Sequence, residues 1–362
     1  MIPFLNLTPG VDAADVRAAI ERVVARGWFV LGPELEMFEG RFASACGAHH
    51  AVGVGTGTDA LALALRVAGV GPGDEVITAP VSAAYTALAI MMVGARPVFA
   101  DIDPDRLTLD PRATAAAVTP RTRAIMPVHL YGQPADMPAL MDVATRHGLL
   151  VVEDCCQSHL ATCAGRPVGS FGVAAAYSFY PTKNLGALGD GGAITTNDAA
   201  LAARLRRVRN GGQTDRYHHG EFGVNSRLDE IQAAVLLARL DWLPRWTDER
   251  RALAAEYRRR LADAPVLVPA EHDPGHVYHL FPVLSPERAA IQAHLKSRGI
   301  ETLIHYPVAI PRQPAVAAER PAMCPVADRV CDEVFSLPLH PGMTRQAIEE
   351  VAAAVQAFHA PA

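Results

Sequence analysis

The chain has 362 residues, enough for a large core and, by length, for about two domains. Half of the residues are hydrophobic and 20% are charged, which is the composition of a globular protein in water. The net charge is −5 with neutral histidines and no long basic run occurs, so neither nucleic acid nor an acidic membrane surface is indicated as a partner.

Targeting signals and cysteine spacing indicate in which cellular compartment the protein is expected. Met1 to Phe4 lack a basic segment that leads into an apolar one, so no signal peptide is predicted. The apolar stretch from Thr86 to Val93 runs into Gly94 and is too short to span a bilayer. The six cysteines lack metal-type paired spacing, and Cys155 and Cys156 are adjacent. We therefore expect free thiols and a cytoplasmic protein without membrane contact.

The first part of the chain alternates helix and strand patterns. Asp12 to Val24 is predicted to be a helix with Asp12 as its cap, and Pro33 to Ala45 a second helix. A short strand from Ala51 to Val54 then leads through a Gly-rich turn into a helix from Ala60 to Val67. Further strands are predicted at Glu75–Thr78, Arg96–Asp101, Thr122–Val128, Leu149–Glu153, Ala174–Phe179 and Gly192–Thr195, and helices at Ser82–Val93 and Met137–His147.

Apolar strands between helices favour an α/β fold with a mostly parallel central sheet covered on both faces. Ligands of such sheets bind beyond the carboxyl ends of the strands. From Leu228 a long helix is predicted, broken near Pro244 and resumed from Glu249 to Leu261. The rest predicts a smaller α+β unit, with strands at His276–Leu284 and Glu301–Tyr306 and helices at Pro286–Arg298 and Thr344–Phe358. We divide the chain into a large domain, residues 1–245, and a small C-terminal domain, residues 246–362.

The segment from Ser178 to Gly192 contains a lysine in a Gly-rich turn after a strand. Taken alone, Lys183 would be read as one more surface lysine. A lysine in a partly desolvated pocket, however, loses its proton more easily, and the neutral amine can form a Schiff base with an aldehyde. Ser178 offers a hydroxyl to a phosphate on the same loop.

A second segment, Val151 to His159, closes an apolar strand with Asp154. A helix cap is the ordinary interpretation of this aspartate. Pyridoxal 5′-phosphate (PLP), however, needs a carboxylate at its pyridine nitrogen, because the protonated ring withdraws electrons from the substrate. Gln157 can hydrogen-bond the phenolic oxygen of the same ring.

Two further segments carry weaker signals. The turn from Gly55 to Leu61 is neither a Walker loop nor a clean dinucleotide fingerprint, but its N–H groups and helix dipole can bind one phosphate. The segment from Gly223 to Ala234 contains Asn225 and Arg227, and a capping sequence before a helix explains most of it.

Together these segments resemble those of the DegT-type sugar aminotransferases, a branch of the aspartate-aminotransferase-like (fold type I) PLP enzymes. The resemblance covers nearly the whole chain, from Gly27–Pro33 through Gly71–Ile77 to Ser336–Pro341. The sequence looks most like members that aminate the 3-keto group of thymidine-diphosphate sugars, because of His129–Pro134 and Tyr217–His219.

The resemblance implies a role for each matched residue. Lys183 matches the Schiff-base lysine, which also shuttles the proton, Asp154 the partner of the pyridinium, and Gln157 the neighbour of the phenolic oxygen. The phosphate contacts match Gly57, Thr58, Ser178 and, from the neighbouring subunit, Asn225. The family is dimeric with both active sites at the interface, and glutamate is its usual amino donor. The acceptor would be a nucleotide-linked keto sugar or a related cyclic ketone, in amino-sugar or natural-product biosynthesis.

The chain departs from the family pattern in three places. Cys155 and Cys156 replace two alanines, and Cys156 is expected against one face of the ring. Pro80–Tyr85 lacks the usual stacking aromatic or His for the other face, which leaves Val81, Ser82 or Tyr85 for that place. A His often found near position 311 is absent. The candidates on the substrate side are Tyr131, His218, His219 and His305.

Other functions remain open. A PLP-dependent sugar dehydratase or eliminase is one, although family dehydratases replace the lysine by His and Lys183 is present. A non-catalytic PLP-binding regulatory protein is another. An enzyme for free amino acids would want a dedicated arginine, and no motif supplies one. His218 and His219 have no third ligand at sensible spacing, so no metal is predicted.

Overall fold

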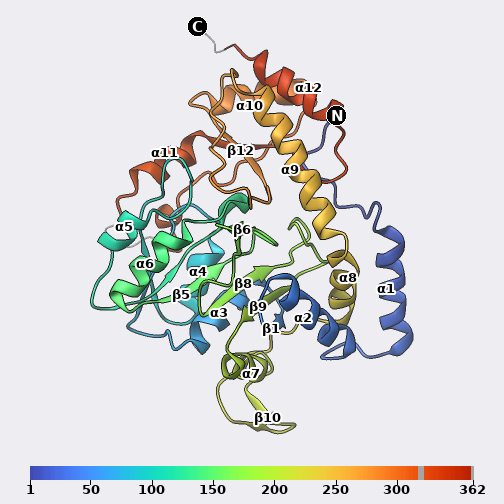
Figure 1. The fold of residues 1–362 in the computed structure, drawn as a ribbon, viewed down its shortest axis with the longest axis vertical. Helices are drawn as coiled ribbons and strands as arrows, with labels where there is room; N and C mark the ends of the chain where they lie inside the picture. The colour runs from blue at the N-terminus through green and yellow to red at the C-terminus, as the bar shows by residue number, and fades with distance from the viewer. Residues whose placement is uncertain (317–321, 360–362) are drawn as a thin grey trace.

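The computed structural model describes residues 1–316 and 322–359. In these residues a central sheet has the strand order β1-β9-β8-β5-β4-β2-β3, with helices on both sides (Figure 1). Its strands are β1 His50–Val54, β2 Glu75–Thr78, β3 Arg96–Phe99, β4 Thr122–Met126, β5 Leu150–Asp154, β8 Ala174–Ser178 and β9 Gly192–Thr196. Of these, β9 runs against its neighbours β1 and β8, and the other pairs are parallel. The predicted α/β fold with a mostly parallel sheet is confirmed.

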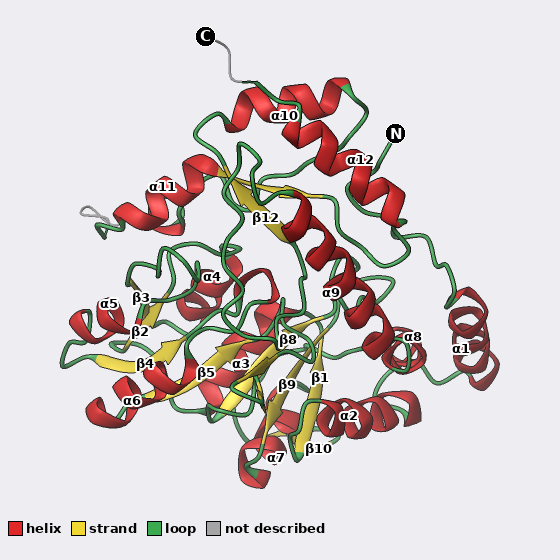
Figure 2. Cartoon of the chain, turned by 45° about the horizontal axis from the view of Figure 1, so that its top comes forward, coloured by secondary structure: helices red, strands yellow, loops and turns green. Residues whose placement is uncertain are grey.

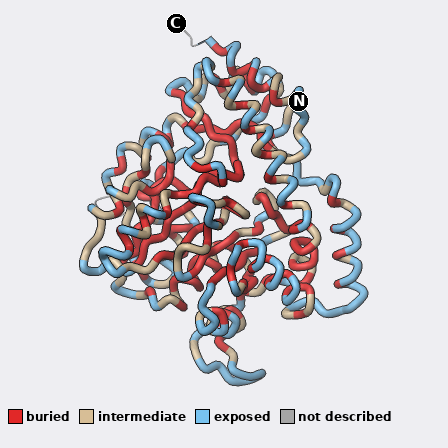
Figure 3. The backbone as a smooth tube through the Cα atoms, in the orientation of Figure 1, coloured by how far each residue is buried: buried red, intermediate tan, exposed pale blue. Residues whose placement is uncertain are grey.

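Helices cover both faces of the sheet because successive strand residues point to opposite sides. Val151 lies in a core with α2, α6 and α8, whereas Val152 lies in a core with α3, α4 and α7. Figure 3 shows the buried residues gathered on the sheet and the inner sides of these helices. The helices of this part are α1 Ala13–Arg26, α2 Pro33–Ala45, α3 Gly57–Val67, α4 Tyr85–Met92, α5 Pro111–Ala116, α6 Met137–His147, α7 Ala199–Val208 and α8 Glu230–Leu240.

Helix α9, Leu243–Arg260, leads from α8 beside the sheet to a second unit, whose core its C-terminal half helps to form (Figure 2). Its core joins Tyr257 with Phe281 and Phe335 of the antiparallel pair β12 and β13. Ile2 packs against this core and pairs with Ile300, so the N-terminal segment lies with the C-terminal one. Its elements are β12 Phe281–Leu284, α10 Arg288–Ser297, α11 Pro325–Glu333, β13 Val334–Leu337 and α12 Arg345–Gln356. The predicted boundary at residue 245 falls within α9.

Several predicted elements differ in the structure. The break in the long helix comes before Pro244, which lies in the first turn of α9, where the missing N–H of proline leaves no helical bond unmade. Asp12 occupies the N-cap position of α1 as predicted, but its side chain makes no capping hydrogen bond, because its oxygens accept from the Gly10 N–H at 2.9 Å and from Arg239 at 2.8 Å. The strand expected at Glu301–Tyr306 is wrong, since that segment makes a single bridge, from Leu303 to Ser336, and otherwise forms a cavity wall.

Smaller elements were not anticipated from the sequence. They are α5, α7, α11 and β13, together with the hairpins β6 Thr162–Cys163 with β7 Arg166–Pro167 and β10 Gln213–Asp215 with β11 His218–His219. The six cysteines are all free, as expected. Within the described residues, no helix has the length and apolar character that crossing a membrane requires.

Candidate active site

A cavity of about 1310 Å³ opens beyond the carboxyl ends of the sheet strands. Thr56, Asp154 and Ser178 line it at or after the ends of β1, β5 and β8, and the second unit contributes residues from Gln292 to Tyr306. This is the place where ligands of parallel sheets bind.

Lys183 lines this cavity from the turn that follows β8. The turn is tight: the N–H of Lys183 donates to the Tyr180 carbonyl at 2.8 Å, and a Cβ on Gly186 would lie 2.4 Å from the Pro181 oxygen. Burial lowers the pKa of the Lys183 ammonium, while negative charge at Cys156 and Asp154 opposes that shift. The lysine therefore loses its proton at a lower pH than an ordinary lysine.

Asp154 ends β5, is 4% exposed and lines the same cavity. Its Oδ2 accepts a hydrogen bond from Thr86 Oγ1 at 2.8 Å, and its Oδ1 accepts one from the Cys156 N–H at 3.1 Å. Each carboxylate oxygen thus has a donor within the protein, and the oxygens keep acceptor capacity for a ligand. Thr86 was not among the predicted site residues.

Gln157 is held at both ends of its amide. Its Oε1 accepts from the Tyr131 N–H at 2.7 Å, and its Nε2 donates to the Tyr306 hydroxyl at 3.1 Å. Burial raises the pKa of Tyr306 to about 12, so the phenol stays protonated near neutral pH. Tyr306 lines the cavity and was also missed.

The first residues of α3 form a polar end of the cavity. Thr56 caps the helix by accepting from the Asp59 N–H at 3.0 Å, and Gly57 and Thr58 follow it on the cavity wall. The first N–H groups of a helix lack helical partners and carry its positive dipole end, which suits a phosphate. A Cβ on Gly57 would lie 2.7 Å from the Ser178 Cβ, so glycine permits the close approach of these two segments.

Comparison with known proteins decides the family. The model of the DegT/DnrJ/EryC1/StrS aminotransferase family matches residues 11–356. The chain belongs to this family. It is 48% identical over 350 residues to the dTDP-3-amino-3,4,6-trideoxy-alpha-D-glucose transaminase of Streptomyces venezuelae, covering 95% of this chain and 92% of that protein.

Solved structures agree with this assignment. S. venezuelae DesV in complex with a ketimine intermediate aligns with a TM-score of 0.95 and 48% identity over 98% of this chain and 97% of that one. Bacillus subtilis ntda with bound cofactor PMP aligns with a TM-score of 0.91 and 30% identity over 98% and 84%. The DegT-family chain is therefore an aminotransferase of fold type I, as its sequence indicated.

In this DegT-family chain the unusual thiol faces the site. Cys156 lines the cavity, with its Sγ 3.1 Å from the position that a Cβ on Gly57 would take. Burial raises the pKa of Cys156, so it stays a neutral thiol. Among the three candidates for the second ring face, Ser82 and Tyr85 line the cavity, whereas Val81 is buried and lies off it.

The substrate-side candidates separate into two groups. His305 lines the cavity, where burial lowers its pKa to about 4 and its Nδ1 lies 2.9 Å from Ser336 Oγ. Tyr131 is buried and off the cavity wall, and its hydroxyl donates to the His305 carbonyl. Tyr131 therefore contacts the backbone of His305 on the side that faces away from the cavity.

His218, His219 and Asn225 are exposed and lie off this cavity. The two histidines are on the hairpin that projects beyond α7, at the opposite end of the molecule from α12 (Figure 1). His218 contacts Asp215 at 2.6 Å and His219 the Gly211 carbonyl at 2.7 Å.

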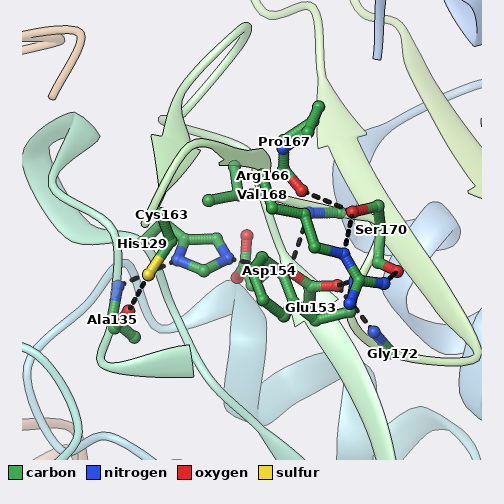
Figure 4. Close-up of polar contacts among 12 residues, drawn as sticks. His129, Ala135, Glu153, Asp154, Cys163, Arg166, Pro167, Val168, Ser170 and Gly172 are labelled. Carbon is green, nitrogen blue, oxygen red and sulfur yellow. Dashed lines mark hydrogen bonds and ion pairs between the residues drawn. The ribbon is translucent and has the colours of Figure 1, made fainter. Parts of the chain in front are cut away.

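A buried cluster beside the site brings three side chains of metal-binding type within 4.8 Å of one another. Figure 4 shows the polar contacts of two of them, His129 and Glu153. The cluster comprises His129, Glu153 and Cys155, but the carboxylate of Glu153 already accepts three backbone N–H groups, from Gly169 at 2.7 Å and from Phe171 and Gly172 at 2.8 Å. His129 Nδ1 accepts from the Ala135 N–H at 3.0 Å, which leaves its Nε2–H for Glu153 at 3.3 Å. The carboxylate of Glu153 and the imidazole of His129 are thus used to hold backbone segments next to Asp154.

Proposed function

We propose that this aminotransferase carries PLP on Lys183 and moves an amino group from glutamate to a nucleotide-linked keto sugar. The observation that carries the proposal is that Lys183 and Asp154 line one cavity that begins at the N-terminus of α3. Amine, carboxylate and helix terminus match the three groups of PLP that need partners: aldehyde, pyridine nitrogen and phosphate.

The residues present fit this cofactor. Asp154 is a buried carboxylate with acceptor capacity to spare, and the close contact of Gly57 with Ser178 brings a hydroxyl to the free N–H groups of α3. Cys156 adds a neutral, polarisable wall and Gln157 an amide whose orientation is fixed. The similar structure of Bacillus subtilis ntda with bound cofactor PMP supports the same cofactor class.

When bound, PLP supplies an electron sink that stabilises negative charge at the substrate carbon. Lys183 Nζ would hold the cofactor and, once released, take the proton from that carbon and return it, a role that its lowered pKa favours. Asp154 would hold the ring proton by accepting it in a hydrogen bond. Gln157 Nε2 has a second N–H beyond the one given to Tyr306, and this can orient the ring oxygen.

The size of the cavity supports a large acceptor. Pockets for small ligands hold about 300 to 1,000 Å³, and this one holds about 1310 Å³. PLP would occupy part of this volume, and a nucleotide-linked sugar is an acceptor large enough to use the rest. The relative at 48% identity is named as a dTDP-sugar transaminase, which favours the same class of acceptor here.

The proposal includes a homodimer in which each copy completes the other's site. Asn225, His218 and His219 are exposed and lie off their own chain's cavity, which leaves them available to the site of a second copy. Large apolar side chains are exposed in the same molecule, as an interface requires. They include Trp28 at 54%, Phe29 at 47%, Tyr180 at 52%, Tyr217 at 78% and Phe222 at 74%.

Purified protein tests the cofactor and the reaction. We expect visible absorbance from the lysine-bound cofactor, its loss when glutamate alone is added, and its return when a nucleotide-linked keto sugar follows. Lys183→Ala should abolish both the absorbance and the transfer. Wild-type protein without PLP would refute the proposal. If the spectrum of bound PLP did not change on addition of glutamate, a regulatory protein would be favoured. If the sugar lost water instead of gaining an amino group, a dehydratase would be favoured.

Mixed dimers test the shared site. Lys183→Ala and Asn225→Ala protein are each expected to be weak or inactive alone. After unfolding together and refolding, a heterodimer has one site with both native residues if Asn225 acts across the interface. Activity should then return to a substantial fraction of wild type. If Asn225 acted within its own chain, both sites of the heterodimer would stay defective.

A further inference from the structure

The contact between Thr86 and Asp154 joins two segments that are far apart in sequence. Thr86 is the second residue of α4, and its hydroxyl lies 2.8 Å from Asp154 Oδ2 at the end of β5. Both side chains are buried, Thr86 at 1% and Asp154 at 4% exposure. Water therefore has little access with which to replace this hydrogen bond.

The direction of the hydrogen bond follows from the neighbours. An ionised Asp154 can only accept, so the hydroxyl proton of Thr86 must point to it. The other polar atoms near Thr86 Oγ1 are the Ala83 carbonyl and the Ser82 hydroxyl, both at 3.4 Å. A short contact to a charged acceptor is much stronger than a long one to a neutral group, so the donation to Asp154 is preferred.

Thr86 and the backbone fix the carboxylate together. The Cys156 N–H holds Oδ1 at 3.1 Å while Thr86 holds Oδ2, so neither rotation about the carboxyl bond nor a change of rotamer is free. A carboxylate held in this way presents its remaining acceptor positions to the cavity that Asp154 and Thr86 both line.

We propose that Thr86 is a positioning residue that orients Asp154 toward the pyridine nitrogen of the cofactor. The inference rests on the proposed binding of PLP at this site. Its alternative is a local role for Thr86, in which the hydroxyl only bonds the Ala83 carbonyl in the first turn of α4 and the methyl group packs. The two roles differ in what removal of the hydroxyl does to the cofactor.

The test compares two substitutions in the full-length protein. Thr86→Val keeps the branched shape and removes the hydroxyl, whereas Thr86→Ser keeps the hydroxyl. We expect Thr86→Val to bind PLP about 10-fold more weakly, as the loss of one hydrogen bond to a charged group implies. It should also shift the pH at which the cofactor spectrum changes. Thr86→Ser should stay within about 3-fold of wild type.

A matched control separates these effects from loss of a buried hydroxyl in general. Thr114 is buried in α5, and its Oγ1 donates to the Asp110 carbonyl at 2.7 Å, remote from the cavity lining. Thr114→Val should change the unfolding transition only and leave PLP affinity and spectrum as in wild type.

A double-mutant cycle keeps the test decisive if one variant is poorly stable. In an Asp154→Asn background, Thr86→Val should add little further loss of PLP affinity, because the hydrogen bond to an ionised partner is already gone. The inference would be overturned if Thr86→Val weakened PLP binding equally in the wild-type and Asp154→Asn backgrounds. It would also be overturned if Thr86→Ser weakened PLP binding as much as Thr86→Val. Wild-type protein that binds no PLP would instead overturn the proposed function.

Discussion

The Gln157 amide donates to the Tyr306 hydroxyl at 3.1 Å, which connects the end of β5 to a segment 149 residues further along the chain. Because the amide oxygen accepts from the Tyr131 N–H at 2.7 Å, the orientation of the amide is determined by its partners. The side chain proposed to touch the cofactor is thus positioned by a residue of the second unit.

Tyr306→Phe should therefore impair catalysis more than folding. The substitution removes the acceptor for Gln157 Nε2 and a polar group from the cavity wall. We expect kcat/KM for the keto acceptor to fall about 10-fold, the cost of one hydrogen bond. Tyr257→Phe is the control, since the buried Tyr257 hydroxyl donates to the Pro338 carbonyl at 2.9 Å, off the cavity wall. A larger kinetic effect of Tyr257→Phe would contradict this assignment.

Gly57→Ala should weaken cofactor binding. The new methyl group would lie 2.7 Å from the Ser178 Cβ and 3.1 Å from the Cys156 Sγ, so the start of α3 must move away from β8. Spectral titration with PLP should show at least about 10-fold weaker binding. Gly40→Ala in α2 is the control, because its Cβ meets nothing within 4 Å and alanine favours a helix. Unchanged PLP affinity in Gly57→Ala would argue against the phosphate site.

Glu153→Gln should destabilise the fold. An amide nitrogen would replace one oxygen of a carboxylate that accepts N–H groups from Gly169, Phe171 and Gly172. At least one donor would then face another donor in the core, at a cost of about 3 kcal/mol in urea unfolding. The exposed pair of Asp142 and Arg146 offers the control, since Asp142→Asn should cost under about 1 kcal/mol. Equal effects of the two changes would contradict the structural role.

Acid should destabilise the protein through buried histidines. Burial lowers the pKa of His159 to about 3 and of His305 to about 4, and holds the pKa of His276 and His279 well below its usual value. Between about pH 6.5 and these lower values the unfolded chain binds protons that the native chain does not, so stability falls as pH falls.

The substitution His159→Leu removes one of these titratable groups and so measures its contribution to stability. Both ring nitrogens of His159 are buried without a hydrogen-bond partner among the described residues. As the pH is lowered from 6 to 4, the free energy of unfolding of the variant should rise relative to that of wild type by about 1.4 kcal/mol for each pH unit. Urea unfolding of apo-protein at several pH values measures this gain. A stability difference that does not vary with pH would exclude a neutral, buried His159.

Much of the central sheet could be predicted because buried parallel strands are continuous apolar runs. The strand from Glu75 to Thr78 and the helix from Pro33 to Ala45 have the predicted bounds. Glu301–Tyr306 has the same kind of pattern, but the structure uses it as a cavity wall. Leu303 is 49% exposed and Ile304 and Tyr306 are only half-buried, and a local pattern does not distinguish such a wall from a strand in a sheet.

By itself the sequence predicted the fold class, the family and the residues proposed for the chemistry: Lys183 and Asp154 come at or after the ends of apolar strands, and the carboxyl ends of parallel strands meet at one edge of a sheet. Only the tertiary structure decided which side chains support them. Thr86 and Tyr306 each contact a proposed site residue, Asp154 and Gln157, by one hydrogen bond across 68 and 149 residues, and such contacts leave no periodicity or spacing in the sequence. It also decided that Tyr131 lies behind the cavity and that His218, His219 and Asn225 lie outside it, because exposure depends on how distant segments pack.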